Sequence, residues 1–270
     1  MNKPQTATHW YDRLWAAYIF FTRLPLWRIH QPPRACYSAV VEWWPLVGWL
    51  TGAVMASVLY FGSLLLPYEV AVLTAIAARM LLTGALHEDG LADFIDGFGG
   101  GGGDRQRTLD IMKDSHIGTY GVLALVVYVG LLFLTLRSLP PFVAALTILA
   151  ADPFAKMLSA QIIMMMPYAR TAETAKARTV YRRMSTPATV LLAFQGLVPL
   201  GLYLYYFKEL LDWQYLVFTP CLVMYFLYRL IWSRLRGYTG DCCGALFLLT
   251  ELTVYLAAAC LMASAKMPLA

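Results

Sequence analysis

Long apolar runs separated by short polar stretches set the pattern of this chain. The runs are about 20 residues long, which is enough for a helix to cross a hydrocarbon core of about 30 Å. Only helices and closed barrels satisfy every backbone group in lipid. The pattern therefore predicts an all-α fold, a polytopic membrane helix bundle of about seven transmembrane helices in one domain over residues 1–270. The expected spans are 43–66, 70–86, 120–136, 142–166, 188–207, 215–232 and 245–262.

The segment 10–28 ahead of these spans has a different pattern, in which aromatic residues alternate with charges. Trp10, Trp15 and Trp27 suit the headgroup zone of a bilayer, and Arg23 interrupts the apolar run. This composition predicts an interfacial amphipathic helix. A short re-entrant segment is the alternative.

Composition excludes a soluble domain, because 60% of the residues are hydrophobic, only 14% are charged, and the mean hydropathy is +0.59. The net charge of +5 comes without a basic stripe interleaved with aromatics, so the expected partner is the lipid bilayer and not nucleic acid. None of the five cysteines has zinc-site spacing, so we interpret them as small hydrophobes. The N-terminal residues show no cleavable signal.

Lysines and arginines are distributed unevenly between the two sets of connections. The stretches 3–34, 87–119, 167–187 and 229–241 hold 16 of the 21 basic residues, whereas the alternate connections and the C-terminal tail hold three. By the positive-inside rule, the first set lies in the cytoplasm and the C-terminus lies outside.

The stretch 87–119 carries seven of the 16 acidic residues. Within it, Asp89, Asp93 and Asp96 stand at positions i, i+4 and i+7, which share one stripe of a helix. Like charges on one face repel each other unless a cation lies among them. Carboxylate oxygens suit Mg²⁺, so the spacing predicts a metal site. A solvated acidic face is the alternative, and spacing alone does not separate the two.

Glycines within the same stretch favour the metal site. Gly90 and Gly97 each cost a helix about 1 kcal/mol relative to alanine, and they allow a backbone or ligand to approach closely. The glycine run 99–103 offers backbone N–H groups that suit a phosphate, but a flexible spacer is the more common role of such a run.

Further polar residues lie near the ends of the expected spans. Lys113, Asp114 and Ser115 precede the third span, where they form a helix cap or add a fourth carboxylate. His87 is a proton carrier or a hydrogen-bonded structural residue. The turn 237–241 leads into the last span.

Four charged residues lie inside expected spans, where ionisable groups are functional candidates. Arg79 is in the second span and Glu251 in the last. Asp152 and Lys156 are four residues apart in the fourth span, so a neutral pair is the simpler interpretation of these two.

Taken together, these segments resemble the cobalamin synthase family, the adenosylcobinamide-GDP ribazoletransferases. The resemblance runs from residue 20 to about residue 251. It rests on the segments 21–25, 44–48, 87–97, 111–121, 167–170 and 239–245.

The resemblance implies an integral enzyme of the bacterial cytoplasmic (inner) membrane, acting late in assembly of the vitamin B12 nucleotide loop. A hydroxyl of α-ribazole, or of its 5′-phosphate, displaces GMP from adenosylcobinamide-GDP with Mg²⁺ as cofactor. The active site would face the cytoplasm, and the resemblance suggests a homo-oligomer. Neither the lower-ligand base nor the phosphorylation state of the ribazole follows from the sequence.

The motif positions carry expected roles in that reaction, which is a phosphotransfer. The expected metal ligands are Asp89, Asp93 and Asp96, and the expected catalytic residues are His87 and Asp114. The expected substrate-binding residues are Arg23, Lys113, Ser115, Thr239, Asp241 and Glu251. We expect Asp114 and Asp241 to lie beside the metal site.

The chain departs from the family pattern in places, which puts substrate contacts in doubt more than the metal site. His116 replaces a usual arginine, Arg236 replaces a usual glycine, and Leu248 stands where a glutamate is common.

Two other functions fit parts of the pattern. A CDP-alcohol phosphotransferase also uses an acidic helix, but here Asp93 follows Ala92 where that pattern has an arginine. A membrane transporter would place its ionisable groups near the bilayer midplane, whereas these acids gather at one mouth of the bundle.

Overall fold

A computed structural model describes residues 9, 11–170 and 180–266, and helices dominate this part of the chain. No β-strand occurs within these ranges; one isolated bridge joins Tyr168 and Tyr238. The α-helices are α1 (Asp12–Phe21), α2 (Trp44–Ser63), α3 (Tyr68–Thr83), α4 (Leu86–Gly100), α5 (Arg105–Lys113), α6 (Thr119–Ser138), α7 (Pro141–Ala160), α8 (Ile162–Met165), α9 (Thr186–Tyr206), α10 (Trp213–Leu235) and α11 (Gly240–Lys266). Two 3₁₀ helices, η1 (Leu26–Arg28) and η2 (Arg34–Trp43), lie between α1 and α2.

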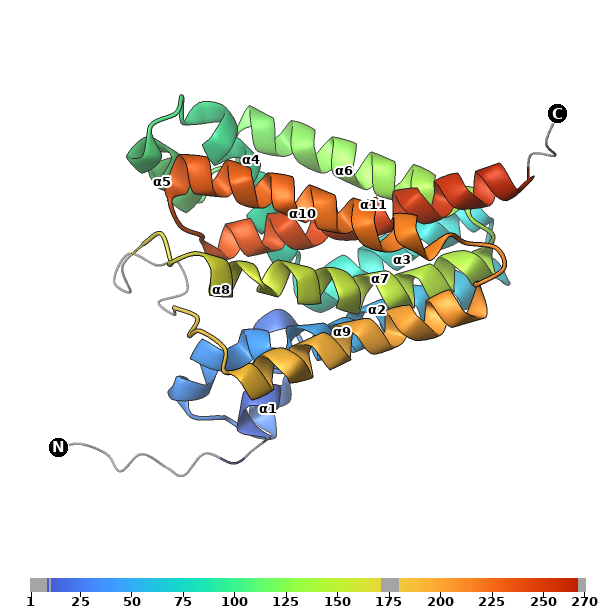
Figure 1. Ribbon diagram of the computed structural model, residues 1–270, viewed down its shortest axis with the longest axis horizontal. Coiled ribbons are helices and arrows are strands. Elements are labelled where there is room, and N and C mark those ends of the chain that lie inside the picture. Colours follow the sequence, from blue (N-terminus) through green and yellow to red (C-terminus); the bar gives the residue numbers. More distant parts are fainter. Residues whose placement is uncertain (1–8, 10, 171–179, 267–270) are drawn as a thin grey trace.

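The long helices run side by side along the molecule (Figure 1). In the described ranges, six helical segments are long and apolar enough to cross a membrane, and a seventh is reached if α3 and α4 count as one bent span. This confirms the prediction of an all-helical membrane bundle. Helix α1, helix α5 and the turn between α10 and α11, which belong to the stretches rich in basic residues, lie toward the left-hand end in Figure 1, and α11 ends at the other side.

The predicted span 70–86 corresponds to α3 (Tyr68–Thr83), but its straight continuation into the acidic stretch is wrong. Helix α3 ends at Thr83, and the chain then turns by 90° into α4 instead of continuing straight into the acidic stretch. The turn is made by Gly84 and Ala85, whose φ angles of 65° and 53° are left-handed and incompatible with a continuing helix.

The segment before η2 forms the short helix α1, which is not among the candidate spans. Ala16 and Ala17 are fully buried, and Asp12 accepts hydrogen bonds from His30 Nε2 at 2.6 Å and from the His9 backbone N–H at 2.7 Å. A location at the membrane surface remains a prediction, and Trp10 lies outside the described residues.

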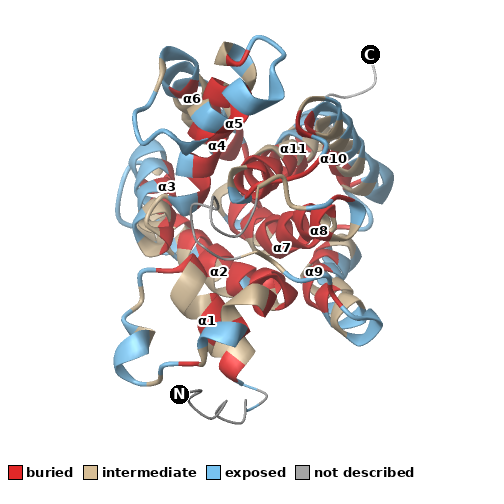
Figure 2. Cartoon of the chain, turned by 90° about the vertical axis from the view of Figure 1, so that its left-hand side faces the viewer, coloured by how far each residue is buried: buried red, intermediate tan, exposed pale blue. Residues whose placement is uncertain are grey.

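The core of the bundle is formed around α7 and α11. In the most apolar 18-residue stretch of the spans that contain α7 and α11, 78% and 61% of the residues are buried, against 22–28% in α6, α9 and α10. Helix α4 is also largely buried, although it carries the acidic motif (Figure 2). Glu88, Asp93 and Asp96 on α4 are therefore packed into the bundle, whereas Asp89 and the acids at 104, 110 and 114 are exposed.

Candidate active site

A cavity of about 140 Å³, counted as the space open to the centre of a water molecule, lies where α1, α2, α4 and α11 meet. It combines an aromatic wall with two carboxylates and a guanidinium group. The segments that contribute to it are far apart in the sequence, so only the tertiary fold creates it. Its lining is Phe20, Phe21, Val41, Trp44, Leu86, His87, Asp89, Gly90, Tyr168, Arg170, Tyr181, Gly240, Asp241, Cys243 and Gly244.

Two glycines allow α4 and α11 to cross in direct backbone contact at this cavity. A Cβ added to Gly90 would lie 3.2 Å from the Cα of Asp241, and one added to Gly244 would lie 3.1 Å from the carbonyl oxygen of His87. The expectation that Gly90 permits close approach is therefore confirmed, and the partner is a backbone. The crossing places Asp89 and Asp241 in the wall of one cavity.

Helix α4 carries the three predicted metal ligands in three different environments. Asp89 is exposed and lines the cavity, whereas Asp93 is buried within the bundle and has a polar partner. Asp96 is also buried, and its two oxygens accept hydrogen bonds from the backbone N–H groups of Gly118 and Gly121 at 2.7 and 2.9 Å. Asp96 thus caps the start of α6.

Nowhere in the described ranges do three or more His, Cys, Asp or Glu side chains gather as a ready metal site. The oxygen donors nevertheless fit Mg²⁺, because Asp89 and Asp241 face the same cavity. This ion typically takes one or two carboxylates and completes its shell with water and substrate phosphates. The metal remains a prediction.

The loop after α8 is held against the turn before α11, which places a phenol in the cavity wall. The backbone N–H of Ala169 donates to the carbonyl of Tyr238 at 2.8 Å, and the backbone N–H of Tyr238 donates to the carbonyl of Pro167 at 3.0 Å. Gly237 is needed here, since a Cβ would lie 2.7 Å from the Pro167 oxygen. Burial raises the pKa of Tyr168 to about 12, so its hydroxyl is protonated at neutral pH.

Three predicted site residues are exposed at the turn between α5 and α6 and do not line the cavity. Lys113 and Ser115 extend into solvent. Asp114 accepts hydrogen bonds from the ring Nδ1 of His116 at 2.7 Å and from its backbone N–H at 3.1 Å, and these bonds hold the pKa of Asp114 below its usual value. The structure places Asp114 outside the cavity, although we expected it beside the metal site.

Arg23 and Thr239 have clear local partners in the fold. The exposed Arg23 side chain passes directly over Gly84, at the turn between α3 and α4, and its backbone N–H donates to the Leu82 carbonyl at 2.7 Å. Thr239 Oγ1 accepts from the backbone N–H of Cys242 at 3.3 Å, so Thr239 caps α11. Substrate contacts by these two residues remain predictions.

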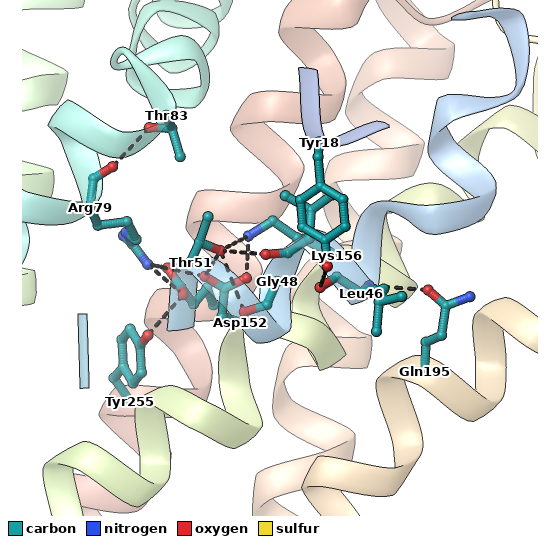
Figure 3. A network of polar contacts seen from close by, with 12 residues as sticks. Tyr18, Leu46, Gly48, Thr51, Arg79, Thr83, Asp152, Lys156, Gln195 and Tyr255 are labelled. Atoms are coloured by element: carbon teal, nitrogen blue, oxygen red, sulfur yellow. Dashed lines mark hydrogen bonds and ion pairs between the residues drawn. The ribbon is translucent and has the colours of Figure 1, made fainter. Parts of the chain in front are cut away.

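Glu251 is fully buried and does not line the cavity. Its partners Arg79 and Tyr255 lie in the polar network of the bundle core (Figure 3). Arg79 Nη1 donates to the two oxygens of Glu251 at 2.6 and 2.7 Å, and the hydroxyl of Tyr255 donates to Oε1 at 2.8 Å. Glu251 therefore forms a buried ion pair between α3 and α11, and its contact with substrate stays a prediction. The remaining in-span charges also pair: Lys156 donates to Asp152 and, at 3.1 Å, to Thr51 Oγ1, which confirms the predicted neutral pair.

Sequence reasoning missed the aromatic wall of the cavity. Trp44, Tyr168 and Arg170 all fall in segments that carry the family resemblance, yet no spacing rule links them to α4. The available sequence evidence was that these residues lie in motifs shared with the family. Such motifs mark residues as candidates for function, but they do not show that the residues share one cavity.

Comparisons with known proteins agree with the motifs. A family model described as cobalamin-5-phosphate synthase matches residues 13–259. The chain is 32% identical over 260 residues to an adenosylcobinamide-GDP ribazoletransferase of Leptospira interrogans, covering 95% of this chain and 97% of that protein. It is 36% identical over 241 residues to an enzyme of the same name from Vibrio parahaemolyticus, covering 88% of each chain.

A third relative, the adenosylcobinamide-GDP ribazoletransferase of Ralstonia pickettii, is 33% identical over 247 residues, which are 91% of this chain and 94% of that protein. No solved structure matches the chain significantly. The comparisons support neither a transporter nor a CDP-alcohol phosphotransferase. By its motifs and by similarity over nearly its whole length, this multi-pass membrane protein belongs to the cobalamin-5-phosphate synthase family.

Proposed function

We propose that the cavity between α4 and α11 is the active site in which this chain acts as an adenosylcobinamide-GDP ribazoletransferase. Membership of the family supplies the reaction. A ribose hydroxyl of the ribazole forms a bond to the cobinamide-side phosphorus, and the bond from that phosphorus to the bridging oxygen breaks. GMP leaves with the electron pair, and the proton of the hydroxyl passes to a base.

The observation that carries the proposal is the meeting of Asp89 and Asp241 at one cavity, which also holds Arg170. A phosphoryl transfer needs its charged groups neutralised and its reactants held in line. Arg170 is anchored by a hydrogen bond from Nη2 to the Leu109 carbonyl at 2.7 Å, so its guanidinium is held beside the cavity.

The two carboxylates are the residues that would hold Mg²⁺ in this cavity. When bound, that ion would neutralise the phosphate oxygens and stabilise the leaving group. Asp93 lies one turn along α4 from Asp89 and completes the acidic face. Asp96 has a different role in this proposal, because its oxygens already accept two backbone hydrogen bonds at the start of α6.

Purified full-length protein tests the proposal through GMP release from adenosylcobinamide-GDP. We expect Asp89→Asn and Asp241→Asn each to lower turnover by about 100-fold or more, as when an electrostatic group is removed from a site. Asp110→Asn is the matched control, since Asp110 is an exposed carboxylate outside the cavity that contacts Gln106. Near-normal turnover in either cavity variant contradicts the proposed site.

Metal binding has a separate readout in the same variants. We expect Mg²⁺ to raise the melting temperature of the wild type in the presence of GDP, and to do so less in Asp89→Asn. An equal shift in the variant would place the metal elsewhere.

The bias of basic residues supports a further proposal, that the end of the bundle holding this cavity faces the cytoplasm. GDP-activated substrates are made there. A reporter that fluoresces only in the cytoplasm should stay dark when fused to the C-terminus and glow when inserted in the exposed turn at Gly102. The opposite result overturns the orientation. Homo-oligomer formation stays a prediction.

A further inference from the structure

One end of the cavity is built from three aromatic rings that lie nearly parallel. Phe21 and Trp44 have ring centroids 5.3 Å apart with planes 12° apart, and the His87 ring lies 5.8 Å from Trp44 with planes 22° apart. Trp44 and His87 are 2% and 4% exposed. These rings come from α1, α2 and α4, so three separate segments build one aromatic wall of mutually stacked rings.

Two polar atoms in this wall have no partner. Trp44 Nε1 and His87 Nε2 are both buried and make no hydrogen bond to any residue in the described ranges. A buried donor or acceptor that is left unpaired destabilises the folded state, so a ligand that pairs with it is favoured. Both side chains line the cavity. A wall of stacked rings with unpartnered ring nitrogens is suited to a planar heteroaromatic ligand.

The His87 ring packs against Phe247, which in turn contacts a buried cation. Phe247 meets His87 edge-on with centroids 4.8 Å apart, and the Lys156 ammonium lies 3.9 Å from the centroid of Phe247. Lys156 is itself fixed by Asp152 and Thr51. The aromatic wall is thus connected through Phe247 to the ionic network of the bundle core.

We infer that this aromatic end of the cavity, formed by Phe21, Trp44 and His87, binds the planar base of the ribazole acceptor. The inference rests on the proposed function, and it names the part of the substrate that this part of the site holds. A benzimidazole nucleoside has one unsubstituted ring nitrogen on an otherwise apolar bicycle, so a single N–H donor in an apolar wall satisfies it. The ribose then extends toward Asp89 and Asp241, where its hydroxyl accepts the cobinamide phosphoryl group.

Guanine, the other small base in the reaction, fits this end less well. Its edge carries several donors and acceptors, each of which needs a partner once it is buried. The aromatic end offers two ring nitrogens. The cavity volume of about 140 Å³ corresponds to roughly ten water-sized positions, which suits one bicyclic base but not the large corrinoid half of the donor substrate.

Binding titrations without turnover test the inference. Full-length protein in detergent is titrated with α-ribazole and, separately, with GDP. For Trp44→Leu we expect the Kd for α-ribazole to rise about tenfold, because the base loses an aromatic stacking partner. The Kd for GDP should stay unchanged. Trp43→Leu is the matched control, because Trp43 Nε1 also lacks a partner in the described ranges and its ring does not line the cavity.

Two results overturn the inference. One is an unchanged Kd for α-ribazole in Trp44→Leu. The other is a higher Kd for GDP in Trp44→Leu with no change for α-ribazole, which would assign the wall to guanine. Absence of α-ribazole binding by the wild type also counts against it. If Trp44→Leu does not fold, Trp44→Phe keeps a smaller ring and removes the N–H, and the same direction is expected.

The titration and the GMP-release assay separate the two proposals. Retained turnover in Asp89→Asn with weakened α-ribazole binding in Trp44→Leu would leave the base site standing and overturn the proposed metal ligand. Lost turnover in Asp89→Asn with normal α-ribazole binding in Trp44→Leu would support the proposed metal ligand and overturn the base site.

Discussion

Removing the carboxylate of Glu251 should unfold the bundle far more easily than removing any surface charge. Glu251 is fully buried, and Arg79 is 2% exposed. Arg79 Nη2 also donates to the Tyr128 hydroxyl at 3.1 Å, while Asp152 Oδ2 lies 4.0 Å from Nη1. In Glu251→Leu, the guanidinium would lose both of its short charge-assisted hydrogen bonds and keep only these weaker partners.

The size of the effect follows from the burial of the pair. Breaking a buried ion pair by removing one partner costs about 3–5 kcal/mol, because the other charge is left uncompensated. For a chain of this length, that corresponds to a fall in melting temperature of roughly 10 °C. Replacing both charges, as in Arg79→Met with Glu251→Leu, removes the stranded charge and should recover much of the loss.

Cysteines native to the chain provide the assay. Cys36, Cys242 and Cys243 are buried free thiols, so a thiol-reactive fluorophore reports unfolding when they become accessible. A Cys260→Ser background removes the exposed thiol that would react in the folded state.

The matched control is a second ion pair between helices, which is exposed. Arg137 Nε donates to Glu69 at 2.9 Å, and the two side chains are 50% and 49% exposed. Glu69→Leu should cost no more than about 1 kcal/mol. The reasoning is refuted if Glu251→Leu melts no lower than Glu69→Leu, or if the double variant at positions 79 and 251 is less stable than Glu251→Leu alone.

Three further predictions concern local structure. Asp96→Ala removes the acceptor for two backbone N–H groups at the start of α6. It should lower the free energy of unfolding by about 1–2 kcal/mol, measured by the same thermal melt. An unchanged melting temperature would show that Asp96 does not stabilise α6 as a cap. Arg236→Gly should raise stability by up to about 1 kcal/mol, because Arg236 has a left-handed φ of 51°, less the contact that its guanidinium makes with Trp232; a lower melting temperature would contradict this. Burial raises the pKa of Asp12, but hydrogen bonds from His30 and His9 outweigh this effect and hold the pKa below its usual value. Asp12 therefore stabilises the docking of α1 above about pH 4, and this stabilisation is lost as the pH falls. Proteolysis of α1 should accelerate at low pH, and Asp12→Asn should remove this pH dependence.

Much of the fold could be predicted because it depends on patterns that are local in the sequence. The apolar runs predicted the long helices, and the charge bias predicted which connections share an end of the bundle. The turn after α3 was missed. Gly84 is a recognisable end of a helix, but Ala85 in a left-handed conformation follows no propensity, and its strain is maintained by the packing of α4 against α11.

The candidate site was predicted in part. Asp89 and Asp241 were identified by their motifs, and the structure brings both to one cavity. Asp96 belongs to the same motif as Asp89, and Glu251 follows the motif of Asp241 on α11, yet the fold gives both of them structural partners. A helical spacing shows which residues share a stripe, but it does not show what packs against that stripe.

The sequence by itself determined that this is a helical membrane protein of the cobalamin-5-phosphate synthase family with its acids concentrated in one stretch. Composition, run length and motif order are properties of the chain that hold without knowledge of its packing. Only the tertiary structure decided which acids face a cavity, which cap a helix and which neutralise a buried cation. The physical reason is that a carboxylate acquires its role from the donors around it, and these come from helices whose closest contacts are set by packing at residues such as Gly90 and Gly244.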